Sequence, residues 1–121
     1  MSEKRILIVD DDKSINAVFK TMLEEQGYSV HTASSGQEAL SLADSSFDLV
    51  ILDIKLPDIT GEEVAKVMKE RGMADNIVLM TGYPELEDCI DTLGVGIQEI
   101  LLKPISPDEI LRVAREALST I

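Results

Sequence analysis

Residues 49–61 read LVILDIKLPDITG, and this stretch decides the fold. Its first four residues are apolar and include β-branched side chains, which predicts a strand buried on both faces, as in a parallel sheet covered by helices. The strand ends at Asp53, and a loop that contains Pro57 and Gly61 follows. Ligands of open α/β sheets bind beyond the carboxyl ends of the strands, so we expect Asp53 at a functional edge.

The composition indicates one acidic globular domain, which we expect to span residues 1–121. Only 3% of the chain is aromatic, against 45% hydrophobic residues, so the core is expected to be aliphatic. The formal net charge of −12 argues against a nucleic-acid-binding surface. The sequence has no apolar run of membrane-spanning length, and its single cysteine, Cys89, fits a reducing compartment, so we expect a cytoplasmic domain without membrane contact.

Short apolar runs alternate with amphipathic segments along the chain. The pattern predicts strands at residues 6–9, 28–33, 49–53, 76–80 and 100–102, and helices at about 13–26, 36–43, 61–71, 84–93 and 107–118. Five strands alternating with five helices predict an α/β fold with a doubly wound parallel sheet. Because βαβ crossovers are right-handed, the flavodoxin-like strand order 2-1-3-4-5 is the natural candidate.

Capping patterns set the expected helix boundaries. Ser35, Thr60 and Ser106 each precede a glutamate by three residues, which is the spacing of a capping box. Gly27 and Gly72 are expected to follow the ends of the first and third helices. The apolar period predicts that the first helix turns five side chains toward the core: Ile15, Val18, Phe19, Met22 and Leu23.

Polar residues follow four of the five predicted strands, and we expect them to meet at one edge of the sheet. They are Asp10, Asp11 and Asp12 after the first strand, Asp53 after the third, Thr81 after the fourth and Lys103 after the fifth. Clustered carboxylates repel one another unless a cation neutralises them, and Mg²⁺ prefers carboxylate, water and phosphate oxygens. A lysine and a hydroxyl suit a phosphoryl group. The edge therefore predicts phosphoryl transfer to an aspartate.

Other residues have simpler interpretations. Asp12 is interpreted as a helix cap and Asp58 as a loop charge. His31 lies on a predicted edge strand without acidic or metal-binding neighbours in sequence, which favours a surface imidazole. Cys89, within a predicted helix, is interpreted as a small packing residue.

The sequence resembles the receiver domain of two-component response regulators over essentially its full length. The resemblance rests on motifs at the expected strand ends: VDDD at 9–12, LDIKLP at 52–57, TG at 60–61, MTG at 80–82 and KP at 103–104. It implies that Asp53 accepts a phosphoryl group from a phosphohistidine of a sensor histidine kinase or a histidine phosphotransfer protein. Such a domain promotes its own phosphorylation and slow dephosphorylation and is not an enzyme in the usual sense.

The resemblance also implies a metal site with Mg²⁺ as cofactor. Asp11 and Asp53 would ligate the ion directly, the backbone carbonyl of Lys55 would be a third protein ligand, and Asp10 would act mostly through water.

Two further residues receive roles from the same resemblance. Thr81 would hydrogen-bond a phosphoryl oxygen, and Lys103 would pair with the phosphoryl charge. A cis peptide bond between Lys103 and Pro104 is also implied.

The chain departs from the family at two positions. The family usually has an aromatic residue three positions before the lysine, where this chain has Ile100, and often has Phe where this chain has Ile105. Both lie near the family's usual output surface, formed by the helix at 84–93, the last strand and the last helix, and a homodimer through this surface is one expected arrangement. A β-branched residue has few χ1 choices in a strand. We therefore expect a muted response around Ile100 and the main response in the loop at 81–84.

Two alternatives remain at this stage. A phosphatase resembling the haloacid dehalogenase superfamily would use Asp10 as the nucleophile, with Asp12, Thr81 and Lys103, but it would leave Asp53 unexplained. A receiver-like interaction module that is never phosphorylated is the other. The sequence also leaves open whether the domain stands alone, belongs to a hybrid kinase or precedes an output domain.

Overall fold

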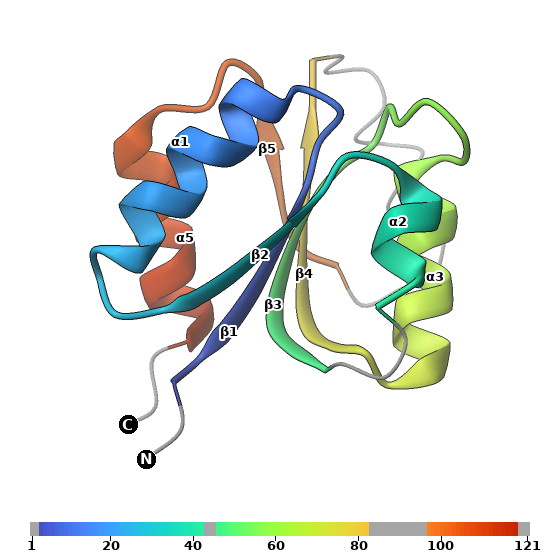
Figure 1. The fold of residues 1–121 in the computed structure, drawn as a ribbon, viewed down its shortest axis with the longest axis horizontal. Helices are drawn as coiled ribbons and strands as arrows, with labels where there is room; N and C mark the ends of the chain where they lie inside the picture. The colour runs from blue at the N-terminus through green and yellow to red at the C-terminus, as the bar shows by residue number, and fades with distance from the viewer. Residues whose placement is uncertain (1–2, 43–45, 83–96, 119–121) are drawn as a thin grey trace.

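The computed structural model describes residues 3–42, 46–82 and 97–118 (Figure 1). The strands are β1 (Arg5–Val9), β2 (Ser29–Ala33), β3 (Phe47–Asp53), β4 (Ala74–Thr81) and β5 (Ile97–Leu102). The helices are α1 (Lys13–Glu24), α2 (Gly36–Leu40), α3 (Gly61–Arg71) and α5 (Pro107–Leu118). The helix expected at 84–93, which includes Cys89, lies outside the described residues, as does that part of the expected dimer surface.

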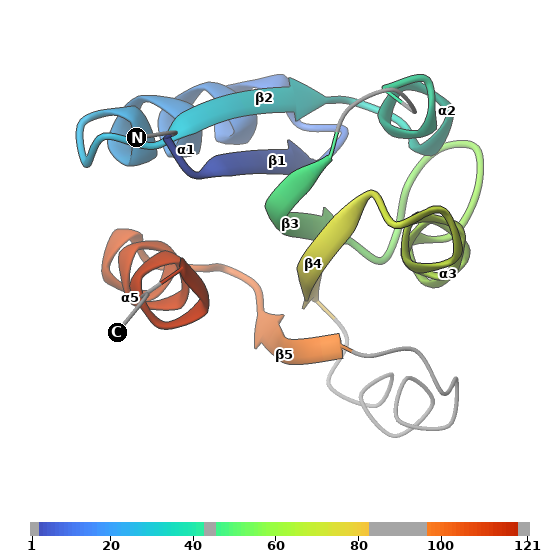
Figure 2. The same ribbon diagram turned by 90° about the horizontal axis from the view of Figure 1, so that it is seen from below.

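All five strands are parallel and lie in the order β2-β1-β3-β4-β5, which confirms the predicted topology. Two helices, α1 and α5, cover one face of the sheet, and α2 and α3 cover the other (Figures 1 and 2). In the strand register, Val9 lies beside Leu52 and Asp53 beside Met80. The carboxyl ends of β1, β3, β4 and β5 therefore lie along one edge.

Two largely aliphatic clusters form the core of the described residues, one on each face of the sheet. Leu7, Val50, Leu52, Val64 and Met68 belong to the cluster under α2 and α3. Ile8, Ile51, Phe19, Leu23 and Ile110 belong to the cluster under α1 and α5. Alternate residues of β1 and β3 enter opposite clusters, which explains why these strands are continuously apolar instead of alternating with polar residues.

The boundaries of several elements shift by a few residues from the prediction. Gly27 has a φ of 96° and Gly72 a φ of 68°, so both take the left-handed conformation expected after a helix end. The helix expected over 36–43 ends at Leu40 and is followed by a turn, and β5 begins three residues before the predicted Ile100. Within the described ranges, no helix has the length and apolar character needed to cross a membrane.

The predicted inner face of α1 is wrong at one position. Val18 is 54% exposed, while Asn16 is buried. The reason is a pair of hydrogen bonds, since the Asn16 amide donates to the carbonyls of Asp10 (2.8 Å) and Ala33 (3.2 Å). These bonds hold the Asn16 face of α1 against the ends of β1 and β2 and turn Val18 outward.

Gly61 lets α3 start directly against the end of β3. A Cβ on Gly61 would lie 2.3 Å from the Asp53 carbonyl oxygen and 2.7 Å from the Ile54 Cα. Both are buried backbone atoms, at the last residue of β3 and at the residue after it, so a side chain there would displace the strand that carries Asp53.

We expect Gly61→Ala to lower the free energy of unfolding by about 1–3 kcal/mol, because overpacking against backbone forces a shift of β3. Gly82→Ala is the matched control, since a Cβ at Gly82 meets no atom of the described residues within 4 Å. Urea denaturation of both variants measures the effect. Equal stability of the two variants would contradict the close approach at Gly61.

Candidate functional site

Four strand ends contribute to a polar cleft at the carboxyl edge of the sheet. The cleft has a volume of about 480 Å³ and is lined by Asp11, Asp53, Lys55, Leu56, Gly82 and Lys103. Asp10 lies beside it as the residue that follows β1. The structure therefore brings together the aspartates and the lysine that the sequence predicts, from segments far apart in the chain.

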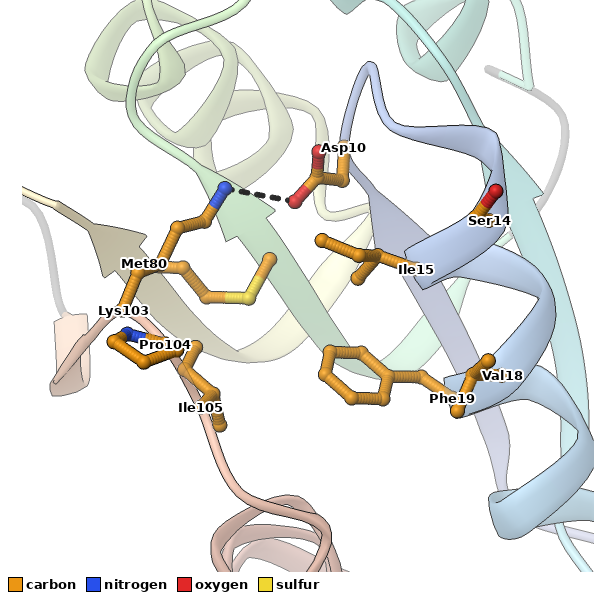
Figure 3. A pocket seen from close by; sticks show the side chains of 9 residues that line it. All are labelled: Asp10, Ser14, Ile15, Val18, Phe19, Met80, Lys103, Pro104 and Ile105. Atoms are coloured by element: carbon orange, nitrogen blue, oxygen red, sulfur yellow. Dashed lines mark hydrogen bonds and ion pairs between the residues drawn. The ribbon is translucent and has the colours of Figure 1, made fainter.

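The ammonium group of Lys103 joins the two buried carboxylates. Its Nζ lies 2.7 Å from Asp53 Oδ2 and 2.9 Å from Asp10 Oδ2. The side chains of Asp53 and Asp10 are 7% and 1% exposed, whereas that of Lys103 is 28% exposed. Figure 3 shows Lys103 reaching Asp10 from the end of β5. Lys103 is thus the one residue of this ion-pair network whose side chain is partly exposed to solvent, while both carboxylates are buried.

Backbone hydrogen bonds orient the second oxygen of each buried carboxylate. Asp53 Oδ1 accepts the Lys55 N–H at 3.1 Å, and Asp10 Oδ1 accepts the Asp12 N–H at 2.9 Å. Each bond spans two residues, as in an Asx turn, and follows directly from an aspartate at the end of a strand. The chain therefore places both carboxylates by local geometry before any ligand is present.

Burial and charge shift the pKa values of the central pair. Burial is the largest influence on the Asp53 carboxyl and raises its pKa above the usual 3.8, although hydrogen bonds from Lys103 and from the Lys55 N–H act in the opposite direction. Burial by itself would lower the pKa of Lys103, but hydrogen bonds and charge from Asp53 and Asp10 outweigh it and raise that pKa. The site thus favours a charged lysine and holds the Asp53 charge at a cost in stability.

Asp10, Asp11 and Asp53 form a group suited to a metal ion. One carboxylate oxygen from each lies within 4.8 Å of the others. Two of these residues are buried, while Asp11 is exposed at the mouth of the cleft. An all-oxygen donor set that is partly open to water fits a hard divalent cation that keeps some of its waters, as Mg²⁺ does.

The other predicted residues also lie at or near this edge. Thr81 ends β4, is 1% exposed, and its carbonyl accepts the Lys103 N–H at 2.7 Å. The Lys103–Pro104 peptide bond is cis, as expected. Ile100, at the family's aromatic position, is half-buried and packs against the cluster under α2 and α3.

Asp12, His31 and Asp58, to which the sequence assigned no role in the site, can now be placed in the structure. Asp12 caps α1 by accepting the N–H groups of Ser14 and Ile15, which confirms the interpretation, and His31 is exposed. Asp58 is more than a loop charge, because its carboxylate accepts two N–H groups at the start of α2. Its sequence position, 22 residues from Gly36, carries no signal for this contact.

An apolar pocket beside the polar cleft was missed by the sequence analysis. It has a volume of about 490 Å³ and is lined by Asp10, Ser14, Ile15, Val18, Phe19, Met80, Lys103, Pro104 and Ile105 (Figure 3). Its walls come from α1 on one side and from the segment after β5 on the other. Only the packing of α1 next to this segment creates it, so no local pattern could reveal it.

Comparison with known proteins decides the family. The model of the response regulator receiver domain matches residues 6–115. The chain belongs to the response regulator receiver family. Its fold is therefore that of a receiver domain in two-component signalling.

Curated relatives are longer than this receiver domain. Response regulator SaeR of Staphylococcus epidermidis is 37% identical over 106 residues, which is 88% of this chain but 46% of the relative. The regulatory protein AtoC of Escherichia coli is 35% identical over 115 residues, which is 94% of this chain and 25% of the relative. The chain thus spans less than half the length of these relatives.

Solved structures match the receiver over nearly its full length. A CheY-like receiver domain protein from Methanospirillum hungatei has a TM-score of 0.84 and 40% identity, with 95% of this chain and 93% of that chain covered. The response regulator TrrA from Thermotoga maritima, in complex with Mg²⁺-BeF, has a TM-score of 0.81 and 38% identity, with 95% and 99% covered.

The phosphatase alternative receives no support. The family match is to the receiver domain, and Asp12, which that alternative needs beside Asp10, is used as the cap of α1. Its carboxylate Oδ1 already accepts two N–H groups, at 2.9 Å and 3.2 Å. We therefore do not retain a phosphatase that uses Asp10.

The raised pKa of Asp53 predicts a pH dependence of stability in the metal-free receiver. Because the folded pKa lies above the unfolded one, the folded state binds more protons between the two values, and stability falls as the pH rises through this window. Asp53→Asn removes this penalty. The measured quantity is the difference in melting temperature, Asp53→Asn minus the unmodified protein, in a buffer that contains a metal chelator. We expect this difference to increase from pH ~4 to pH ~7.

Asp58→Asn is the control of opposite sign. The pKa of Asp58 is lowered, chiefly by the hydrogen bond from the Gln37 N–H, so its charge stabilises the fold above the unfolded pKa and that stability is lost as the pH falls. The melting difference for Asp58→Asn should therefore become more negative as the pH rises. Parallel trends in the two variants would contradict the assignment of charge strain to Asp53.

Proposed function

We propose that Asp53 is the phosphoacceptor of this receiver and takes its phosphoryl group from a phosphohistidine of a sensor histidine kinase or a histidine phosphotransfer protein. The observation that carries the proposal is the placement of the Asp53 carboxylate at the end of β3, in the cleft, between the Lys103 ammonium and two further carboxylates. In the transfer, a carboxylate oxygen of Asp53 forms a bond to phosphorus while the bond from phosphorus to the imidazole nitrogen breaks.

Lys103 supplies positive charge where the phosphoryl group arrives. Its Nζ already contacts Asp53 Oδ2 at 2.7 Å, and its side chain is the most exposed of the three in the ion-pair network. A flexible lysine can keep its bond to Asp10 and turn toward a phosphoryl oxygen on Asp53. Thr81 is proposed to donate its hydroxyl hydrogen bond to another phosphoryl oxygen from the end of β4.

The carboxylates of Asp10, Asp11 and Asp53, together with the backbone carbonyl of Lys55, would hold a divalent cation, proposed to be Mg²⁺. When bound, Mg²⁺ neutralises charge between the carboxylates and the phosphoryl oxygens. Support comes from the oxygens that lie within 4.8 Å of one another. The similar regulator TrrA was solved with Mg²⁺-BeF. Asp11 is the exposed member and keeps the metal side of the cleft open to water.

The apolar pocket suits the protein that donates the phosphoryl group. A phosphohistidine has to approach Asp53 through the cleft, so its carrier must rest on the surface next to Lys103. Val18 is 54% exposed on that surface and lines the pocket together with Ile15 and Ile105. We propose that apolar side chains of the donor protein pack here and align its histidine with Asp53.

The proposed acceptor is tested by chemical phosphorylation. The receiver is incubated with acetyl phosphate and Mg²⁺, and intact mass spectrometry counts the phosphoryl groups. We expect one labile group on the unmodified protein and none on Asp53→Asn. Asp10→Asn, which keeps Asp53, should still be labelled, but more slowly. A labile group on Asp10 or Asp12 of the Asp53→Asn variant would overturn the proposal.

Metal binding is tested by its effect on stability. Because Mg²⁺ binds the folded site, a concentration ~100 times its dissociation constant should stabilise the receiver by about 2.7 kcal/mol. Asp11→Asn should raise the stability of the metal-free protein slightly, by relieving repulsion, and weaken the Mg²⁺ effect. Asp12→Asn is the control, since Asp12 caps α1 and its loss should leave the Mg²⁺ effect intact. Equal Mg²⁺ effects in both variants would exclude Asp11 as a ligand.

A further inference from the structure

The loop between β3 and α3, residues 54–60, is hydrogen-bonded at its start to the proposed acceptor, Asp53. Asp53 Oδ1 accepts the Lys55 N–H at 3.1 Å. The Ile54 carbonyl accepts the Gly61 N–H at 2.7 Å, which holds the two ends of the loop together. A change in what the Asp53 carboxylate binds therefore acts first on this loop.

Asp58 connects the middle of this loop to α2. Its Oδ1 accepts the Gly36 N–H at 2.9 Å, and its Oδ2 accepts the Gln37 N–H at 2.8 Å. The next N–H, of Glu38, is accepted by the Ser35 hydroxyl at 3.0 Å. The first N–H groups of a helix have no partner inside the helix. Two of these three groups on α2 are thus satisfied by a residue more than twenty positions away.

Ile59 adds a close packing contact between the loop and α2. A Cβ on Gly36 would lie 2.3 Å from Ile59 Cγ1 and 3.0 Å from Val64 Cγ2, so the Ile59 side chain rests directly on the helix backbone. Close-packed contacts transmit displacement instead of absorbing it. The helix has five residues and few hydrogen bonds of its own, so it depends on these outside contacts. It lies beside α3 on the same face of the sheet (Figures 1 and 2).

We propose that Asp58 and Ile59 transmit the state of Asp53 to α2, so that the exposed surface of α2 differs between the free and the phosphorylated receiver. A phosphoryl group and a metal ion at Asp53 order residues 53–55, and the loop then holds Gly36 and Gln37 more firmly. This inference rests on the proposed function, because it takes the group on Asp53 as the signal.

Amide hydrogen exchange at single-residue resolution tests the inference. Beryllofluoride with Mg²⁺ stands in for the phosphoryl group, and exchange is followed by NMR with and without it. In the unmodified protein we expect exchange at Gly36 and Gln37 to slow by about fivefold or more, together with changes at Lys55 and Gly61. In Asp58→Ala, Lys55 and Gly61 should still respond, while Gly36 and Gln37 exchange fast in both states.

Ser35→Ala is the matched control, because it removes a cap of the same helix without cutting its connection to the loop. Its Glu38 amide should lose protection, but Gly36 and Gln37 should still respond to beryllofluoride. If Asp58→Ala melts α2 entirely, Asp58→Asn answers the same question: it keeps one acceptor oxygen, so the response should persist at one of the two amides and be lost at the other.

The outcomes separate this inference from the proposed function. A response at Lys55 and Gly61 without one at Gly36 and Gln37 would overturn the coupling and leave the acceptor assignment intact. An undiminished response of α2 in Asp58→Ala and Asp58→Asn would also overturn it. No response at Lys55 itself would contradict the proposed function of Asp53.

Discussion

The ion-pair network of Lys103 with Asp10 and Asp53 is the constraint on which the site depends. Two buried carboxylates side by side would be strongly unfavourable without a cation, and Lys103 Nζ lies within 2.9 Å of both. The lysine is 93 residues from Asp10 and 50 from Asp53, so only a sheet that gathers these strand ends can satisfy it. Since β4 separates β3 from β5, the cation must reach past the end of β4, which a long lysine side chain can do.

This arrangement serves function at the expense of stability. Burial raises the pKa of Asp53 even with Lys103 beside it, so the metal-free fold holds an unfavourable charge. Local rules of good packing and charge pairing are most often broken at functional sites. Under the proposed function, this unfavourable negative charge would give the edge its affinity for a cation. The loop that follows Asp53 ends at Gly61, which packs against the end of β3, and it is hydrogen-bonded to α2 through Asp58. The edge that carries the unfavourable charge is therefore also connected to the helices on one face of the sheet.

Much of the architecture could be predicted because it depends on local sequence patterns. The apolar runs that became β1 and β3, the cap residues Ser35 and Thr60, and the glycines after α1 and α3 all act within a few residues of where they stand. The site aspartates and Lys103 were predictable for a related reason, since parallel strands bring their carboxyl ends to a common edge whatever lies between them. The exposure of Val18 was mispredicted, because hydrogen bonds from Asn16 to two strand ends, and not apolar period, set the rotation of α1.

The sequence by itself therefore determined the strand and helix pattern, the α/β class and the polar residues that meet at the carboxyl edge of the sheet. Three features were decided only by the tertiary structure. Lys103 pairs with both Asp10 and Asp53, and an apolar pocket forms beside α1. Asp58 caps a helix that begins more than twenty residues away in the sequence. The physical reason is the sequence separation over which each kind of interaction acts. Periodicity, capping and turn chemistry act over a few residues of chain, whereas ion pairs, pockets and caps between loops depend on distances that exist only after the layers have packed.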